Sequence, residues 1–201
     1  MGVDTYHHQA IPAATGAPLL FLFHGTGGDE MQLLPIAHSV LPDAGVVAPR
    51  GDVEEHGANR FFRRHDEGIY DMEDLARATD KMSDFVRAHI AEQRPEKVVG
   101  LGYSNGANIL ASVVFADPTL FETVVLMHPL IPFKPQIGGT EFRTRVLVTA
   151  GREDPICPPS TTQRLMSYLK GAGARAELLW HHGGHELRPE EVNAAARFLA
   201  E

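Results

Sequence analysis

The feature that most constrains this fold is a sharp turn predicted between a strand and a helix. Residues 98–101 form a short apolar run, typical of a strand buried on both faces of a sheet. The sequence Gly-Tyr-Ser-Asn-Gly follows at residues 102–106, and a helical pattern continues to residue 116. This order of strand, G-x-S-x-G and helix predicts that Ser104 lies at the tip of the turn.

The two glycines of this turn have a steric role. A residue at so sharp a tip is forced towards positive φ, and side chains two positions before and after it would collide with the turn. Gly102 and Gly106 remove those side chains. The Ser104 hydroxyl then lies above the first turn of the helix, where unpaired N–H groups and the helix dipole favour negative charge. This is a nucleophile's position, although the motif alone leaves open a serine that only caps the helix.

Six apolar runs alternate with helical patterns along the chain. The runs lie at residues 19–23, 45–48, 98–101, 123–127, 145–149 and 176–180. Helices are predicted at 33–40, 71–93, 105–116 and 160–169, with a closing helix from Pro189 and an edge strand at 5–9. The alternation predicts one α/β domain over residues 1–201, a mostly parallel sheet between two layers of helices. The loop at 130–141 has no sequence for a folded lid domain.

Composition limits the partners of the chain. The formal net charge of −8 over 201 residues argues against nucleic acid or an anionic membrane as the main partner. The first residues lack a basic segment followed by an apolar core, and no apolar run is long enough to span a bilayer. We therefore expect a cytoplasmic protein without stable membrane association. Cys157 is the only cysteine, so no internal disulfide can form.

Four loops that follow predicted strands carry polar or glycine-rich motifs. They read HGTGG from residue 24, GYSNG from 102, GREDP from 151 and HGGHE from 182. The carboxyl ends of parallel strands meet at one edge of a sheet, where ligands bind. A serine nucleophile needs a histidine base, which in turn needs a carboxylate. The chain order Ser104, Asp154, His185 fits that requirement.

Asp154 is preferred as the carboxylate of this set. Asp154-Pro155 begins a turn that can direct the carboxylate inward, although an aspartate that only caps the turn stays an alternative. Glu153 lacks that turn position. Asp117 also precedes a proline, but it lies at the far end of the helix after Ser104 and therefore at the wrong edge of the sheet.

His185 is preferred as the base over His181 and His182, which still belong to the strand end. Gly183 and Gly184 provide a flexible connection that can bring His185 back over the serine. Three histidines this close are also compatible with a metal ion. However, H-H-x-x-H is not a strong zinc signature and no second ligand cluster is evident, so we expect no metal.

The loop at residues 24–30, HGTGGDE, is the candidate for an oxyanion hole. Its glycines allow the backbone to approach a ligand closely, and the N–H of Thr26 would complement the N–H of Asn105. Alternatives are a flexible connection or a phosphate-binding loop. The latter would require a lysine at a defined spacing, and the loop has none.

The segment from residue 50 to 70 is long, polar and without evident secondary structure. It contains the cluster Arg60-Phe61-Phe62-Arg63-Arg64. Long loops of this kind are often functional, so the aromatic residues are candidates for a pocket wall and the arginines for contact with an anionic group. A surface loop anchored by Phe61 and Phe62 is the alternative.

These motifs predict acyl transfer, with Ser104 attacking an ester carbonyl and His185 moving the proton. No cofactor is required. The four motifs, in this order and over nearly the whole chain, resemble the bacterial phospholipase/carboxylesterase family of small α/β-hydrolases. The closest branch is similar to the carboxylesterases associated with hydroquinone and catechol resistance. Threonine at 26 and asparagine at 105 depart from the commoner leucine and glutamine of that family, which leaves the acyl-chain preference open.

The resemblance implies a compact α/β-hydrolase without a large cap that hydrolyses short-chain or aryl carboxylic esters. It places the catalytic residues at Ser104, Asp154 and His185 and also suggests a homodimer. Candidates for the substrate pocket are Phe61, His128 and Ile156, with core or loop packing as the alternative for Phe61 and His128. We expect Cys157 to be an inert, buried thiol. A thioesterase or lysophospholipase, and a non-catalytic ligand-binding protein on this scaffold, are the competing interpretations.

Overall fold

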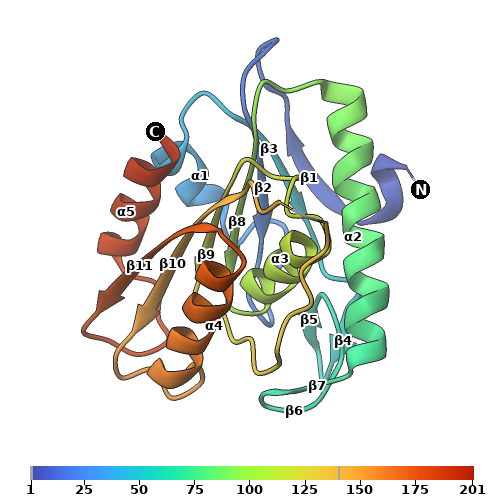
Figure 1. The fold of residues 1–201 in the computed structure, drawn as a ribbon. Helices are drawn as coiled ribbons and strands as arrows, with labels where there is room; N and C mark the ends of the chain where they lie inside the picture. Colours follow the sequence, from blue (N-terminus) through green and yellow to red (C-terminus); the bar gives the residue numbers. More distant parts are fainter. Residues whose placement is uncertain (1, 140) are drawn as a thin grey trace.

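The computed structural model describes residues 2–139 and 141–201, and a seven-stranded sheet runs through it (Figure 1). The strand order is β1-β3-β2-β8-β9-β10-β11. The strands are β1 (His8–Ile11), β2 (Leu19–Phe23), β3 (Gly45–Pro49), β8 (Val98–Tyr103), β9 (Thr123–Met127), β10 (Arg145–Gly151) and β11 (Arg175–His181). Within this sheet, as far as the described residues show, β1 alone is antiparallel to its neighbour. The predicted mostly parallel α/β-hydrolase fold is confirmed.

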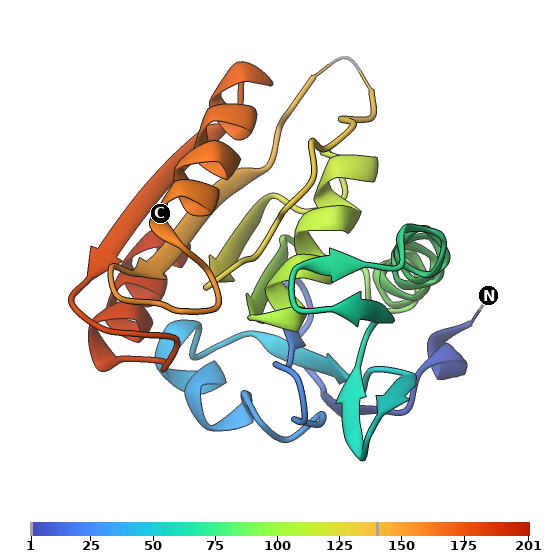
Figure 2. The same cartoon turned by 90° about the horizontal axis from the view of Figure 1, so that it is seen from below.

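Five α-helices of the described chain cover the two faces of this sheet (Figures 1 and 2). The helices are α1 (Leu34–Val40), α2 (Met72–Gln93), α3 (Asn105–Ala116), α4 (Pro159–Gly171) and α5 (Pro189–Leu199). α2, α3 and α4 lie on one face, and α1 and α5 pack together on the other. No helix among the described residues is both long enough and apolar enough to cross a membrane.

The central strands are apolar throughout because each of their faces meets a layer of helices. In β2, Leu19, Phe21 and Phe23 belong to the core beneath α2 and α3, whereas Leu20 and Leu22 belong to the core beneath α1 and α5. All five side chains are at most 1% exposed. Burying an aliphatic or aromatic side chain of this size contributes about 1.5–3 kcal/mol, so these residues fix both faces of the strand.

The N-terminal prediction is wrong in its boundaries. Residues 5–9 do not form one strand, because a 3₁₀ helix at Val3–Thr5 precedes β1. Between the two elements, the ring of Tyr6 packs edge-on against Phe85 of α2 and is 3% exposed. Anchoring Tyr6 against α2 ends the 3₁₀ turn and delays the strand to His8.

The segment 50–70, predicted as an irregular loop, instead contains two small hairpins. β4 (Val53–Glu55) pairs with β5 (Ala58–Arg60), and β6 (Arg64–Asp66) pairs with β7 (Ile69–Tyr70). The first hairpin turns through His56 and Gly57, which both have positive φ, as a two-residue hairpin turn of the primed type requires. Both hairpins lie at the lower side of the molecule in Figure 1, towards which β10 and β11 point.

Candidate active site

Ser104 lies at the tip of the turn between β8 and α3, with φ 53° and ψ −115°. A Cβ on Gly106 would stand 2.0 Å from the carbonyl oxygen of Phe23, and one on Gly102 would stand 2.6 Å from that of Gly106. Neither position has room for a side chain, because both neighbours are backbone atoms. The predicted lack of room at both positions is confirmed, and the predicted clash with the turn holds for Gly102, whereas a side chain at Gly106 would meet the end of β2 instead.

The structure brings Ser104, His185 and Asp154 together at the carboxyl edge of the sheet. Ser104 Oγ lies 2.8 Å from His185 Nε2, and His185 Nδ1 lies 2.8 Å from Asp154 Oδ2. The side chain of His185 is 16% exposed and that of Asp154 is fully buried. An Nδ1–H donated to the carboxylate leaves the lone pair of Nε2 facing the serine hydroxyl, as a general base requires.

Asp154 is a carboxylate held by four hydrogen bonds. Its Oδ1 accepts from the backbone N–H of Ile156 and of Cys157, at 2.8 and 2.9 Å. Its Oδ2 accepts from His185 and also from His128 Nδ1, both at 2.8 Å. Burial alone would raise the pKa of Asp154, but these hydrogen bonds outweigh burial and hold the pKa well below its ordinary value.

Two residues predicted to line the substrate pocket do not do so. Phe61 and His128 are both 0% exposed, so neither side chain reaches an accessible cavity. Phe61 packs against Phe23 and His24 in the core. His128 follows β9, between the strand of Ser104 and that of Asp154, and its ring binds carboxylates on both sides. Ile156, 36% exposed, stays a candidate for substrate contact.

The segment before β6 braces the predicted oxyanion loop. Arg60 Nη1 donates to Thr26 Oγ1 at 2.7 Å, and Gly27 N donates to the carbonyl of Asn59 at 2.9 Å. The backbone N–H of Phe61 donates to Asn105 Oδ1 at 2.8 Å. Among the described residues, the backbone N–H groups of Thr26 and Asn105 have no protein acceptor, as donors to a substrate oxygen would require.

The arginine cluster at 60–64 is largely occupied by acidic partners. Arg60, 2% exposed, lies 3.3 Å from Glu55 Oε2, and Arg64 forms ion pairs with Glu55 and Glu67. A buried cation needs such a partner, because desolvation without one is costly. The predicted alternative, a loop anchored by buried Phe61 and Phe62, agrees with this arrangement better than an anion-binding cluster does.

Cys157 is 1% exposed, and its Sγ lies 3.2 Å from the carbonyl oxygen of His128. Burial raises the pKa of the thiol, so the sulfur stays protonated and unreactive at neutral pH. This environment agrees with the inert thiol that the sequence predicts.

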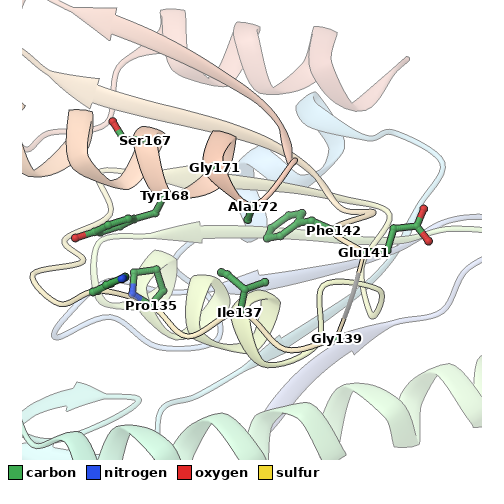
Figure 3. Close-up of a pocket in the computed structure, with 10 residues that line it drawn as sticks. Pro135, Ile137, Gly139, Glu141, Phe142, Ser167, Tyr168, Gly171 and Ala172 are labelled. Carbon is green, nitrogen blue, oxygen red and sulfur yellow. The ribbon is translucent and has the colours of Figure 1, made fainter.

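An open pocket of about 410 Å³ lies away from Ser104, between α4 and the loop that follows β9 (Figure 3). Its lining includes Phe142, Ser167 and Tyr168. The hydroxyl of Ser167 donates to the carbonyl of Gln163 in its own helix, and no histidine lines the pocket. Without a base beside a hydroxyl, the pocket in Figure 3 lacks the chemistry found at Ser104.

Comparison with known proteins identifies the family. A profile of the Dienelactone hydrolase family matches residues 12–196. The chain belongs to the dienelactone hydrolase family. This family member is 36% identical over 193 residues to the protein MhqD of Bacillus subtilis strain 168, across 93% of this chain and 94% of MhqD.

Two solved structures extend the comparison to three dimensions. The protein Atu2452 of Agrobacterium tumefaciens strain C58 is 52% identical, with a TM-score of 0.93, over 100% of this chain and 98% of that one. A carboxylesterase of Bacillus cereus is 37% identical, with a TM-score of 0.91, over 97% of this chain and 93% of that one. The family and this neighbour support an ester hydrolase, and the predicted resemblance to carboxylesterases of the α/β-hydrolase fold is confirmed.

Proposed function

We propose that this dienelactone hydrolase family member is a serine carboxylesterase that hydrolyses short-chain or aryl carboxylic esters. The observation that carries the proposal is the chain of two 2.8 Å contacts from Ser104 Oγ to His185 and from His185 to buried Asp154. A non-catalytic binding protein would have no need for this alignment of nucleophile, base and carboxylate. The carboxylesterase of Bacillus cereus, at 37% identity, supports the same reaction class.

In the first half of the reaction, Ser104 Oγ attacks the ester carbonyl carbon while its proton moves to His185 Nε2. Asp154 stabilises the resulting imidazolium through His185 Nδ1. The carbonyl oxygen becomes an oxyanion, to which the N–H groups of Thr26 and Asn105 donate. His185 then gives its proton to the leaving alkoxide oxygen, the ester C–O bond breaks, and an acyl-serine and an alcohol result.

In the second half, water replaces the alcohol. His185 accepts a proton from the water as its oxygen attacks the acyl carbon, and the same two backbone N–H groups bind the second oxyanion. The bond to Ser104 Oγ breaks, the serine regains its proton from His185, and the carboxylic acid leaves. Every step uses side chains or backbone groups of this chain, so the mechanism calls for no cofactor.

The short connection that follows β9 agrees with a compact esterase for small substrates. The described part of the loop 130–141 has neither helix nor strand, and no described segment forms a lid domain. A thioesterase or lysophospholipase acting on long acyl chains would need an extended apolar groove beside the serine. Hydrolysis of p-nitrophenyl esters of increasing chain length tests this point, and we expect kcat/KM to be highest for the short acyl groups.

Ser104→Ala is the direct test of the mechanism. We expect kcat to fall by on the order of 10⁴-fold or more, with Tm and the circular dichroism spectrum unchanged. A fluorophosphonate should label Ser104 in the wild type and nothing in the variant. Ser167→Ala, which removes the serine of the pocket in Figure 3, is the matched control and should retain full activity. Substantial turnover by Ser104→Ala would exclude the proposed nucleophile.

A further inference from the structure

The carboxylate of Asp154 serves two histidines, only one of which faces the serine. Its Oδ2 lies 2.8 Å from His185 Nδ1 and 2.8 Å from His128 Nδ1. The two imidazole rings are 5.1 Å apart, centre to centre. On its other side, His128 Nε2 lies 3.1 Å from Glu191 Oε1 of α5. His128 therefore links Asp154, the carboxylate that binds His185, to a second buried carboxylate, that of Glu191.

The positions of the acceptors determine how many protons His128 carries. Both of its ring nitrogens face carboxylate oxygens, and a carboxylate accepts but cannot donate. A neutral imidazole protonated on Nδ1 would leave its Nε2 lone pair 3.1 Å from the anionic Glu191 Oε1, with only His181 Nε2, at 3.3 Å, as a donor to it. An imidazolium supplies a proton to each carboxylate. Because the side chains of His128, Asp154 and Glu191 are all 0% exposed, bulk solvent does not solvate a lone pair that lacks a donor.

We propose that His128 is a positioning residue of the active site that is protonated at neutral pH, a buried imidazolium that fixes Asp154 and acts on His185 through the shared carboxylate. The proposal rests on the proposed function, since His185 is the base of that reaction. His128 touches no substrate and acts through Asp154. A positive charge whose ring lies 5.1 Å from that of His185 opposes the gain of a second one, so removing it should change the pH dependence of the reaction.

The surrounding structure fixes both the backbone conformation and the protonation of His128. Its backbone has φ 52°, in the left-handed region, as that of Ser104 does, and a residue is kept there only when its surroundings determine it. Burial would lower the pKa of His128, but the hydrogen bonds to Asp154 and Glu191 outweigh burial and raise it to about 9. The Cys157 thiol, which binds the His128 carbonyl, stays neutral, and the Tyr103 ring packs edge-on against the imidazole.

The surroundings of Glu191 favour its anionic form. It is the third residue of α5, where its Oε2 accepts from the backbone N–H of Arg188 at 2.8 Å and the helix dipole favours negative charge. Its Oε1 accepts from Thr149 Oγ1 at 2.5 Å and forms the ion pair with His128 Nε2 at 3.1 Å. Although burial would raise the pKa of Glu191, the hydrogen bonds from His128 and Thr149 bring it below its ordinary value.

A metal ion bound by His128, His181 and Glu191 is the competing interpretation of this cluster. His181 Nε2 lies 3.3 Å from His128 Nε2 and 3.4 Å from Glu191 Oε2. A metal on Nε2 would force the proton of His181 onto Nδ1, which is buried and has no partner among the described residues. If the Nε2–H of His181 instead points to Glu191, the Nδ1 of His181 carries only a lone pair. Each oxygen of Glu191 already has two partners.

The pH dependence of ester hydrolysis tests whether His128 acts on His185. In His128→Gln, kcat should fall. The acid limb of the kcat/KM profile should also move to higher pH by on the order of one unit or more, because the variant lacks a unit charge about 5 Å from the base. His89→Gln, the same change at a buried histidine of α2, should leave profile and rate unchanged. A lower rate with an unmoved acid limb in His128→Gln would show a merely structural residue and overturn the proposal.

Nuclear magnetic resonance tests the protonation state without turnover, so it is independent of the proposed reaction. In wild-type protein labelled with ¹⁵N-histidine, both ring nitrogens of one histidine should carry protons at pH 7.5, and this signal should vanish in His128→Gln. The result would be the same if the protein proved not to be an esterase. A neutral His128 ring at pH 7.5, or a bound metal ion that is lost in Glu191→Gln, would overturn the proposal.

Discussion

The hydroxyl of Tyr103 donates a hydrogen bond of 2.7 Å to the backbone carbonyl oxygen of His185. The two rings lie 5.6 Å apart, centre to centre, with an angle of 36° between their planes. The last residue of β8, directly before the serine, therefore holds the loop that carries the histidine. Burial raises the pKa of Tyr103 to about 12, so its hydroxyl keeps the proton that it donates.

Tyr103→Phe should lower kcat about tenfold with little change in KM. The substitution keeps the ring but releases the His185 loop, and a base displaced by a fraction of an ångström loses much of its efficiency. Steady-state kinetics on a p-nitrophenyl ester measure the effect. Tyr168→Phe removes a hydroxyl from α4 and should behave as the wild type. Equal rates for both variants would show that the Tyr103 hydrogen bond does not position the base.

Gly106→Ala should prevent folding or destabilise the protein by more than about 3 kcal/mol, since the new methyl group would overlap the carbonyl oxygen of Phe23 and force the backbone apart. Urea denaturation followed by circular dichroism measures the loss. Gly171→Ala, at the end of α4 with open space around the site, is the matched control and should be neutral or slightly stabilising. A stable Gly106→Ala variant would mean that α3 can move away from β2.

Thr26→Val should reduce kcat/KM about tenfold. It preserves the shape of the side chain and the backbone N–H but removes the acceptor of Arg60 Nη1. The buried Arg60 donor then has no partner, and the oxyanion loop is no longer held by this hydrogen bond. Thr26→Ser retains the hydroxyl and should restore most of the activity. Steady-state kinetics on both variants with one ester separate the effect of losing the hydroxyl from that of losing the methyl group. If both lose activity equally, the methyl group rather than the hydrogen bond to Arg60 is what matters.

Unfolding free energy should decline from about pH 6.5 towards pH 9 and above. His128 has a folded-state pKa of about 9 against an ordinary value of 6.5, so its stabilisation is complete below the ordinary value and disappears as the pH rises through the folded one, a contribution on the order of 3 kcal/mol. Urea denaturation at half-unit steps of pH measures the slope. In His128→Gln this component should be missing, and an identical slope in the variant would assign it to another group.

The local motifs carried most of the information about the nucleophile. The apolar run before Ser104, the two glycines and the helix after it all lie within residues 98–116, so the turn and the need for glycine at both positions follow from the sequence. The parallel sheet follows in the same way, since strands alternating with helices have few alternative packings. The hairpins at 53–70 were missed because their strands are short and polar and their first turn is His56-Gly57, a weaker signal than Asn-Gly.

The environment of the acid depended on contacts between distant residues. Glu191 lies 63 positions after His128 in the sequence and reads as an ordinary first-turn glutamate of α5, yet its side chain is 0% exposed and binds that histidine. The sequence alone determined which side chains stand at the ends of the strands, because hydrophobic periodicity and turn chemistry are local. Only the tertiary structure decided that His128 faces inward to two carboxylates rather than outward to a substrate, because the direction of a side chain after a strand depends on which partners the neighbouring strands and helices bring to it.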